Sequence, residues 1–143
     1  MCGIAGFTAP GPDAGQAIAT MNLALAHRGP DGSGCFVDHG IALGHTRLAI
    51  IDLSGGAQPR VDGASGDALT FNGEIYGYRA LADELRAAGI DLRDRSDTEV
   101  LFQLIRRDGM HRALARIDGM FGSWPRPRTG VSRSAARPCR SFR

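Results

Sequence analysis

The chain has 143 residues, 43% of them hydrophobic, which is enough for one globular domain with a buried core. No apolar run approaches the roughly 20 residues that cross a bilayer, and the N-terminus lacks the basic and apolar regions of a signal peptide, so we expect a cytoplasmic location. Its three cysteines and four histidines show no metal-ligand spacing, so we expect neither a disulfide framework nor a metal site.

The net charge of +2 hides an uneven distribution. Residues 1–122 carry eleven basic and fifteen acidic residues, whereas 123–143 carry six arginines, three prolines, four serines and no acid. We expect this tail to be disordered, because it cannot bury enough apolar surface to offset the entropy cost of ordering. It has two interpretations: a basic segment for nucleic acid or anionic lipid, or the product of a frameshift in a GC-rich gene. We favour the frameshift.

The first half of the chain predicts a strand, a helix and a second pair of strands. The expected elements are a buried strand over 2–8, a helix over 14–27, a loop over 27–34 and strands over 35–37 and 41–51. Ile18, Met21 and Leu25 have the spacing of one helix face, so we expect all three to point into the core.

The second half predicts one strand followed by helices. The expected elements are a loop over 53–66, a strand over 68–71, and helices over 78–88, 96–109 and about 110–116. Ser96 and Glu99 have the spacing of a capping box, which predicts a helix N-terminus there. Val100, Leu101, Leu104 and Ile105 follow on one helix face.

Cys2 is the most informative residue. A small residue after the initiator Met permits removal of Met1, which would leave Cys2 with a free α-amine. The thiol is then a nucleophile, and the amine, with a pKa of about 7.7–8.0, is a base a few bonds away. The alternative is that Cys2 is a small buried residue near the chain start.

Six further segments decide between these interpretations. In order, they are MCGIAGF, HRGPDGSG, GHTRLAIIDLSGGAQP, FNGEIYGYRALADEL, RSDTEVLF and IDGMFG. Together they closely resemble the N-terminal glutaminase domain, a class II glutamine amidotransferase, of glutamine-hydrolysing asparagine synthetases. The resemblance covers residues 1–122. It implies an α+β fold of the N-terminal-nucleophile (Ntn) hydrolase type, with two antiparallel sheets between layers of helices, incomplete at the C-terminus.

The resemblance also implies the catalytic residues. Cys2 would attack the side-chain amide of glutamine, and the Asn72 side chain with the Gly73 backbone N–H would stabilise the oxyanion. Taken alone, Asn72–Gly73 would instead predict a hairpin turn.

The expected substrate-binding residues answer the two charges of the glutamine head group. By resemblance, Arg47 binds the α-carboxylate, Glu74 and Asp97 bind the α-ammonium, and Ile50 adds a backbone contact. Arg47 alone would be interpreted as a solvated residue, and Asp97 alone as an acid favoured at a helix start.

Five other residues have secondary expectations. Arg28 and Asp31 are expected to form an ion pair that clamps the loop covering the site. His45 and His27 lie near the site by analogy, but we expect hydrogen-bonded structural roles for both. Cys35 is expected in the core.

The expected function is therefore hydrolysis of glutamine to glutamate and ammonia, as in asparagine biosynthesis. The pattern breaks after Gly122, and the SGGxDS motif of the ATP-binding synthetase domain is absent. ATP and Mg²⁺ would belong to that missing domain, so no cofactor is expected in this chain. A synthetase domain or subunit is the expected ammonia acceptor, with no nucleic acid or membrane partner. The alternatives are an inactive fragment of a frameshifted asparagine synthetase gene, and a protein that binds through its basic tail.

Overall fold

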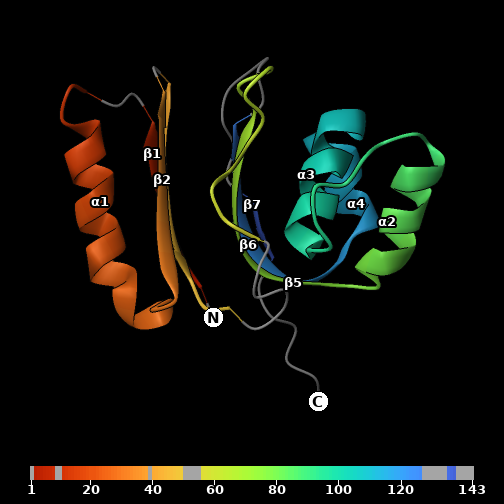
Figure 1. Ribbon diagram of the computed structural model, residues 1–143, viewed down its shortest axis with the longest axis horizontal. Helices are drawn as coiled ribbons and strands as arrows, with labels where there is room; N and C mark the ends of the chain where they lie inside the picture. Colours follow the sequence, from red (N-terminus) through yellow and green to blue (C-terminus); the bar gives the residue numbers. More distant parts are fainter. Residues whose placement is uncertain (1, 9–10, 39, 50–55, 127–134, 138–143) are drawn as a thin grey trace.

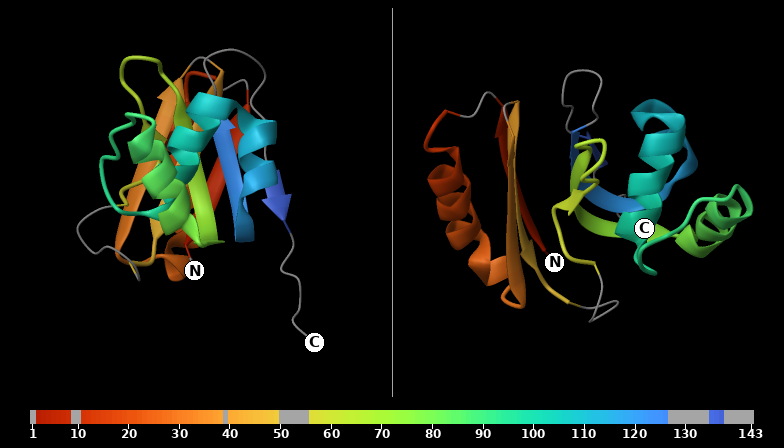
Figure 2. Two further views of the ribbon diagram at one scale, coloured as in Figure 1. Left: turned by 90° about the vertical axis from the view of Figure 1, so that its right-hand side faces the viewer. Right: turned by 45° about the horizontal axis from the view of Figure 1, so that its top comes forward.

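The computed structural model describes residues 2–8, 11–38, 40–49, 56–126 and 135–137. These residues form four layers, seen in Figure 1 from left to right as a helix, a sheet, a second sheet and a group of helices. Figure 2 shows the same order of layers from two other directions. The layers have the arrangement that the sequence predicted.

The first sheet has three antiparallel strands in the order β1-β3-β2. Its strands are β1 (Gly3–Thr8), β2 (Gly32–Asp38) and β3 (Ile41–Arg47). Helix α1 (Ala14–Leu25) covers its outer face and runs into the short 3₁₀ helix η1 (Ala26–Arg28). Gly3, at the start of β1, pairs with Thr46 of the central strand β3, so the start of β1 lies next to the end of β3.

The second sheet has the order β4-β5-β6-β7, again antiparallel. Its strands are β4 (Arg60–Val61), β5 (Ala68–Tyr76), β6 (Asp118–Arg126) and β7 (Ala135–Arg137). The outer helices are α2 (Tyr78–Ala87), α3 (Asp97–Asp108) and α4 (Met110–Arg116). Gly77, before α2, has left-handed backbone angles that glycine adopts without steric cost.

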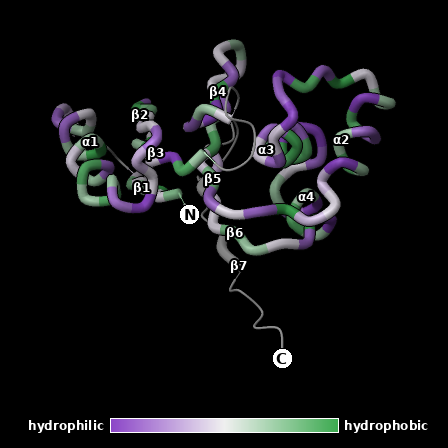
Figure 3. Tube along the Cα trace, turned by 60° about the horizontal axis from the view of Figure 1, so that its bottom comes forward, coloured by the Kyte–Doolittle hydropathy of each residue, from purple (hydrophilic) through white to green (hydrophobic). Residues whose placement is uncertain are grey.

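Buried apolar residues form one cluster at each boundary between layers. The largest joins β5 and β6 to the outer helices, and Figure 3 shows the hydrophobic stretches of α3 and α4 that contribute to it. A second joins Ile18 of α1 to Ala5 and Ala42, and a third joins Ile41 and Leu43 to Ala68 of the other sheet. Apolar burial at three boundaries therefore holds the four layers together.

Side-chain alternation along β3 and β5 decides what faces the space between the sheets. In β3, Leu43 packs toward the second sheet, whereas Thr46 bonds the Leu25 carbonyl on the helix side. His45 and Arg47 follow Leu43 at intervals of two residues, so they lie on the same face of β3. In β5, Thr70 Oγ1 donates to the Gly44 carbonyl across the sheets, at 3.2 Å. Asn72 and Glu74 lie on the same face of β5 as Thr70. The polar residues toward the ends of β3 and β5 therefore face one another.

The structure corrects two local expectations in the first half of the chain. Met21 is 38% exposed, and Asn22 is buried in its place. Its Nδ2 donates to Ser33 Oγ and to the Gly34 carbonyl, both at 3.0 Å, whereas Oδ1 has no hydrogen-bond partner among the described residues. Strand β2 begins at Gly32, so the expected loop over 27–34 ends earlier.

The expected capping box forms only in part. Ser96 Oγ accepts the Glu99 N–H at 3.1 Å, which caps α3 as predicted. The reciprocal bond is missing, because Asp94 Oδ1 accepts the Ser96 N–H at 2.9 Å. Glu99 is drawn into a buried ionic cluster instead.

The predicted domain boundary at Gly122 falls inside β6, which continues to Arg126, and residues 135–137 form β7 beside it. The other tail residues, 127–134 and 138–143, lie outside the described residues, so disorder there stays a prediction. Within the described ranges, no helix is both long and apolar enough to span a membrane.

Candidate active site

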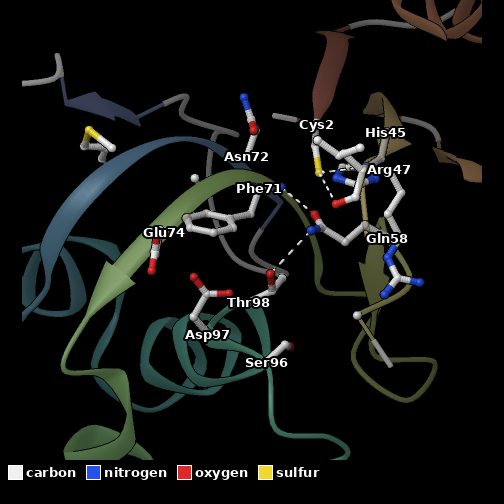
Figure 4. A pocket seen from close by; sticks show the side chains of 14 residues that line it. Cys2, His45, Arg47, Gln58, Phe71, Asn72, Glu74, Ser96, Asp97 and Thr98 are labelled. Atoms are coloured by element: carbon white, nitrogen blue, oxygen red, sulfur yellow. Dashed lines mark hydrogen bonds between the residues drawn. The ribbon is translucent and has the colours of Figure 1, made fainter. Parts of the chain in front are cut away.

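One pocket opens where the polar ends of β3 and β5 face each other. It has a volume of about 190 Å³ and includes the start of α3 and the residue before β1. Six predicted site residues line it: Cys2, Arg47, Asn72, Gly73, Glu74 and Asp97. Figure 4 labels the side chains of all of these except Gly73. The seventh, Ile50, lies outside the described residues.

Backbone contacts fix the position of Cys2. The Gly3 N–H bonds Thr46 Oγ1 at 3.2 Å, which anchors the start of β1 against β3. The Leu48 N–H lies 3.3 Å from Cys2 Sγ, and the thiol faces the Leu48 carbonyl at 3.7 Å. Arg28 Nε donates to the Cys2 carbonyl at 3.2 Å. Leu48 therefore contacts the sulfur, while Thr46 and Arg28 hold the backbone next to it.

Asn72 and Gly73 line the pocket from β5, on a different sheet from Cys2. They lie inside a nine-residue strand paired with Gly122 and Phe121, so the hairpin-turn interpretation is wrong. Any side chain at Gly73 would overlap the backbone of Met120 and Phe121. Glycine thus lets the two strands approach beside the pocket.

Glu74 and Asp97 give one end of the pocket a negative charge. Asp97 Oδ2 accepts the Ile75 N–H at 3.0 Å, which ties the first turn of α3 to β5. Burial raises the pKa of Asp97, and the charge of Glu74 adds to the rise, although backbone N–H groups oppose it. Among the described residues, neither carboxylate has a cationic partner. A bound cation would stabilise both charges.

Three pocket residues were missed or undervalued by sequence reasoning. Gln58 bridges β5 and α3: Oε1 accepts the Phe71 N–H at 2.6 Å, and Nε2 donates to Thr98 Oγ1 at 3.4 Å. Leu48 acts through its backbone, which no side-chain pattern can indicate. His45 lines the pocket and is buried.

The secondary expectations were confirmed only in part. Arg28 bonds Cys2, while Asp31 Oδ2 accepts the Ala49 N–H at 2.8 Å, so they do not pair with each other. Cys35 is exposed rather than in the core, although its Sγ lies 3.2 Å from Asn22 Nδ2 of α1. His27 makes a hydrogen bond, as expected, with Nδ1 3.1 Å from the Ala24 carbonyl, although its side chain is exposed.

A buried ionic cluster of Arg60, Asp94 and Glu99 lies next to the rim of the pocket. Arg60 bonds Glu99 Oε2 at 2.6 Å and also pairs with Asp94. Asp94 accepts the N–H groups of Gly56 and Ser96, two pocket-lining residues. The cluster therefore links β4, α3 and the rim. In the described part of the chain, no group of three or more His, Cys, Asp or Glu side chains is arranged to hold a metal ion.

Sequence comparison identifies the class of protein. The family described as "Glutamine amidotransferase domain" matches residues 1–124. The chain therefore belongs to the class II glutamine amidotransferase family, as its motifs predicted.

Its relatives are larger enzymes. Asparagine synthetase [glutamine-hydrolyzing] 1 of Bacillus subtilis is 39% identical over 126 residues, which cover 85% of this chain and 20% of the relative. Amidase chry2 of Gibberella zeae is 39% identical over 129 residues, covering 77% and 18%. The chain thus spans about a fifth of the curated relatives it matches.

A solved structure confirms the fold. The glutamine phosphoribosylpyrophosphate amidotransferase of B. subtilis matches 90% of this chain and 35% of its own, with a TM-score of 0.63 and 24% identity. The chain therefore shares its fold, with two antiparallel sheets between layers of helices, with that amidotransferase, as predicted.

Proposed function

We propose that this chain hydrolyses glutamine to glutamate and ammonia, with Cys2 as the nucleophile once Met1 is removed. The observation that carries the proposal is the pocket itself. It gathers a thiol, a potential pair of oxyanion donors, an arginine and two carboxylates from separate elements. Family membership supports glutamine as the substrate.

The reaction needs a base, a nucleophile and an oxyanion site. In the proposed step, the Cys2 α-amine takes the thiol proton, and Sγ forms a bond to the amide carbon of glutamine. The Asn72 amide and the Gly73 N–H stabilise the oxyanion, a contribution of about 3–4 kcal/mol for a single donor in other enzymes. The proton then passes to the amide nitrogen, the C–N bond breaks and ammonia leaves. Water next hydrolyses the thioester to glutamate and restores the thiol.

The head group of glutamine would fill the charged end of the pocket. Arg47 presents a planar guanidinium that matches a carboxylate. Glu74 and Asp97 would take the α-ammonium, which compensates the charge repulsion between them.

The ammonia would pass to a synthetase domain or subunit. ATP and Mg²⁺ would act there, since activation of an acceptor acid is a separate reaction from the one proposed for this pocket. The relatives named as asparagine synthetases favour aspartate as the acceptor. Amidase chry2, a relative of similar identity, is not named as an asparagine synthetase. We propose glutamine hydrolysis as the part performed by this chain.

The proposal is tested by measuring ammonia and glutamate from glutamine with the purified chain. We expect Cys2→Ala to abolish release, a loss on the order of 10³-fold or more for removing a nucleophile. Cys35→Ser is the matched control, because Cys35 is exposed and outside the pocket lining. Release that survives Cys2→Ala, or no release from folded wild-type chain, would overturn the proposal.

A further inference from the structure

His45 is a buried polar residue for which the proposed chemistry has no use. Its side chain is 1% exposed and lines the pocket together with Cys2 and Asn72. The alternation of β3 turns it toward the second sheet, two residues before Arg47. Figure 4 shows it near Cys2, away from Glu74 and Asp97.

The two ring nitrogens of His45 differ. The ring is hydrogen-bonded to the backbone of Phe71, and Nε2 has no partner among the described residues, so Nδ1 makes that bond. The Phe71 N–H already donates to Gln58, which leaves the Phe71 carbonyl as the acceptor for Nδ1–H. Burial, aided by the charge of Arg47 and opposed by the Phe71 hydrogen bond, lowers the pKa of His45 to about 4, so the ring is neutral at pH 7. Nε2 is therefore a hydrogen-bond acceptor.

The ring lies at the nucleophile end of the pocket. Its Nδ1 contacts the residue before Asn72, so the side chain spans from the sheet of Cys2 to the strand of Asn72. On its own strand, it is next to Thr46, which pairs with the residue after Cys2. An amide bound between Cys2 and Asn72 would meet this part of the wall.

We propose that Nε2 of His45 accepts a hydrogen bond from the carboxamide N–H of glutamine and so selects glutamine over glutamate. The inference rests on the proposed function of the pocket. An amide offers two N–H donors, whereas the product carboxylate offers only acceptors. A neutral acceptor in the buried pocket wall can pair with an amide N–H, but it offers no hydrogen to a carboxylate oxygen. A contact of this kind discriminates strongly between similar ligands.

The substitution His45→Met tests this role, because it keeps a side chain of similar bulk and removes the acceptor. His45→Gln is the conservative variant, since its side-chain oxygen can reach toward the position of Nε2. Both are made in the Cys2→Ala chain, so that the dissociation constants of glutamine and glutamate are measured by calorimetry without turnover. Circular dichroism checks that each variant is folded.

We expect His45→Met to weaken glutamine binding about tenfold and to leave glutamate binding unchanged or tighter. His45→Gln should restore part of the preference for glutamine over glutamate. If His45→Met does not fold, the two dissociation constants of His45→Gln are compared with those of the Cys2→Ala chain. Equal weakening of both ligands, or an unchanged ratio, would overturn the inference while leaving glutamine hydrolysis intact. If the Cys2→Ala chain binds neither amino acid, both the proposed function and the role of His45 fail.

Discussion

At the scale of single residues, the site is built from backbone contacts as much as from side chains. The sulfur of Cys2 is held by the Leu48 backbone, and the first turn of α3 is held by the bond from Ile75 N–H to Asp97. These contacts depend on how two sheets approach each other. The sequence motifs indicated which residues belong to the site, but the contacts that position them involve backbone atoms that any residue carries.

Asp97 offers a direct test of the head-group assignment. Asp97→Asn removes the charge but keeps an oxygen that can accept the Ile75 N–H. We expect the KM for glutamine to rise about 10- to 100-fold with kcat little changed, since a hydrogen bond to a charged group contributes roughly 1.5–3 kcal/mol. Steady-state kinetics measure both constants.

The matched control is Asp83→Asn, because Asp83 lies on α2, pairs with the exposed Arg86, and is not in the pocket lining. Its KM should equal that of the wild type. A wild-type KM for Asp97→Asn would show that the α-ammonium is bound elsewhere.

At the scale of elements, sequence periodicity predicted which elements form but not every partner. The four apolar residues at 100, 101, 104 and 105 are all buried, as their spacing required. Asn22 and Glu99 are buried too, which no hydrophobic pattern could indicate, because polar residues are interpreted as surface residues. Each bonds partners distant in sequence, such as Gly34 for Asn22 and Arg60 for Glu99.

The buried cluster around Glu99 is expected to govern the stability of α3. Glu99 is fully buried and bonds Arg60 and Gln103 Nε2, the latter at 2.8 Å. Glu99→Ala would leave the Arg60 charge without its main buried partner, a type of change that costs about 3–5 kcal/mol. Urea unfolding followed by circular dichroism measures the loss.

Glu84→Ala provides the comparison, because Glu84 pairs with Arg107 and Arg116 on the surface, where ion pairs contribute little. Its midpoint should stay near that of the wild type. Equal effects of the two substitutions would mean that the buried cluster does not stabilise the fold.

At the scale of the whole molecule, the pocket exists because two sheets face each other with apolar residues at one end and polar residues at the other. The sequence could predict the strands β3 and β5 that line the pocket and, by resemblance, the arrangement of the layers. It could not predict that β6 continues past Gly122, because the Arg- and Pro-rich composition hides a strand that pairs with β5. It also gave no sign that Gln58 bridges β5 and α3.

The contact of His45 across the two sheets makes the stability of the fold depend on pH. The folded pKa is about 4, below the ordinary 6.5, so the unfolded chain takes up the proton first as the pH falls. The stabilisation from a neutral His45 is fully present above pH 6.5 and is lost progressively toward pH 4. We expect a loss of about 2 kcal/mol between pH 8 and pH 5 from this residue.

The raised pKa of Asp97 acts in the opposite direction, so the measurement must isolate His45. Urea midpoints of the wild type and His45→Gln are compared at pH 8 and pH 5. The wild type should lose more stability than the variant over this range. Parallel losses in the two chains would show that His45 is not buried in its neutral form.

The central claim is that Cys2 works as the first residue of the chain, with its own α-amine as the base. The most direct test adds a removable N-terminal extension, whose cleavage by a protease leaves Cys2 as the first residue. Ammonia release from glutamine is measured before and after cleavage, with Cys2→Ala carried through the same steps. We predict no release before cleavage, release after it, and none from Cys2→Ala at either stage. Equal release before and after cleavage would contradict the account.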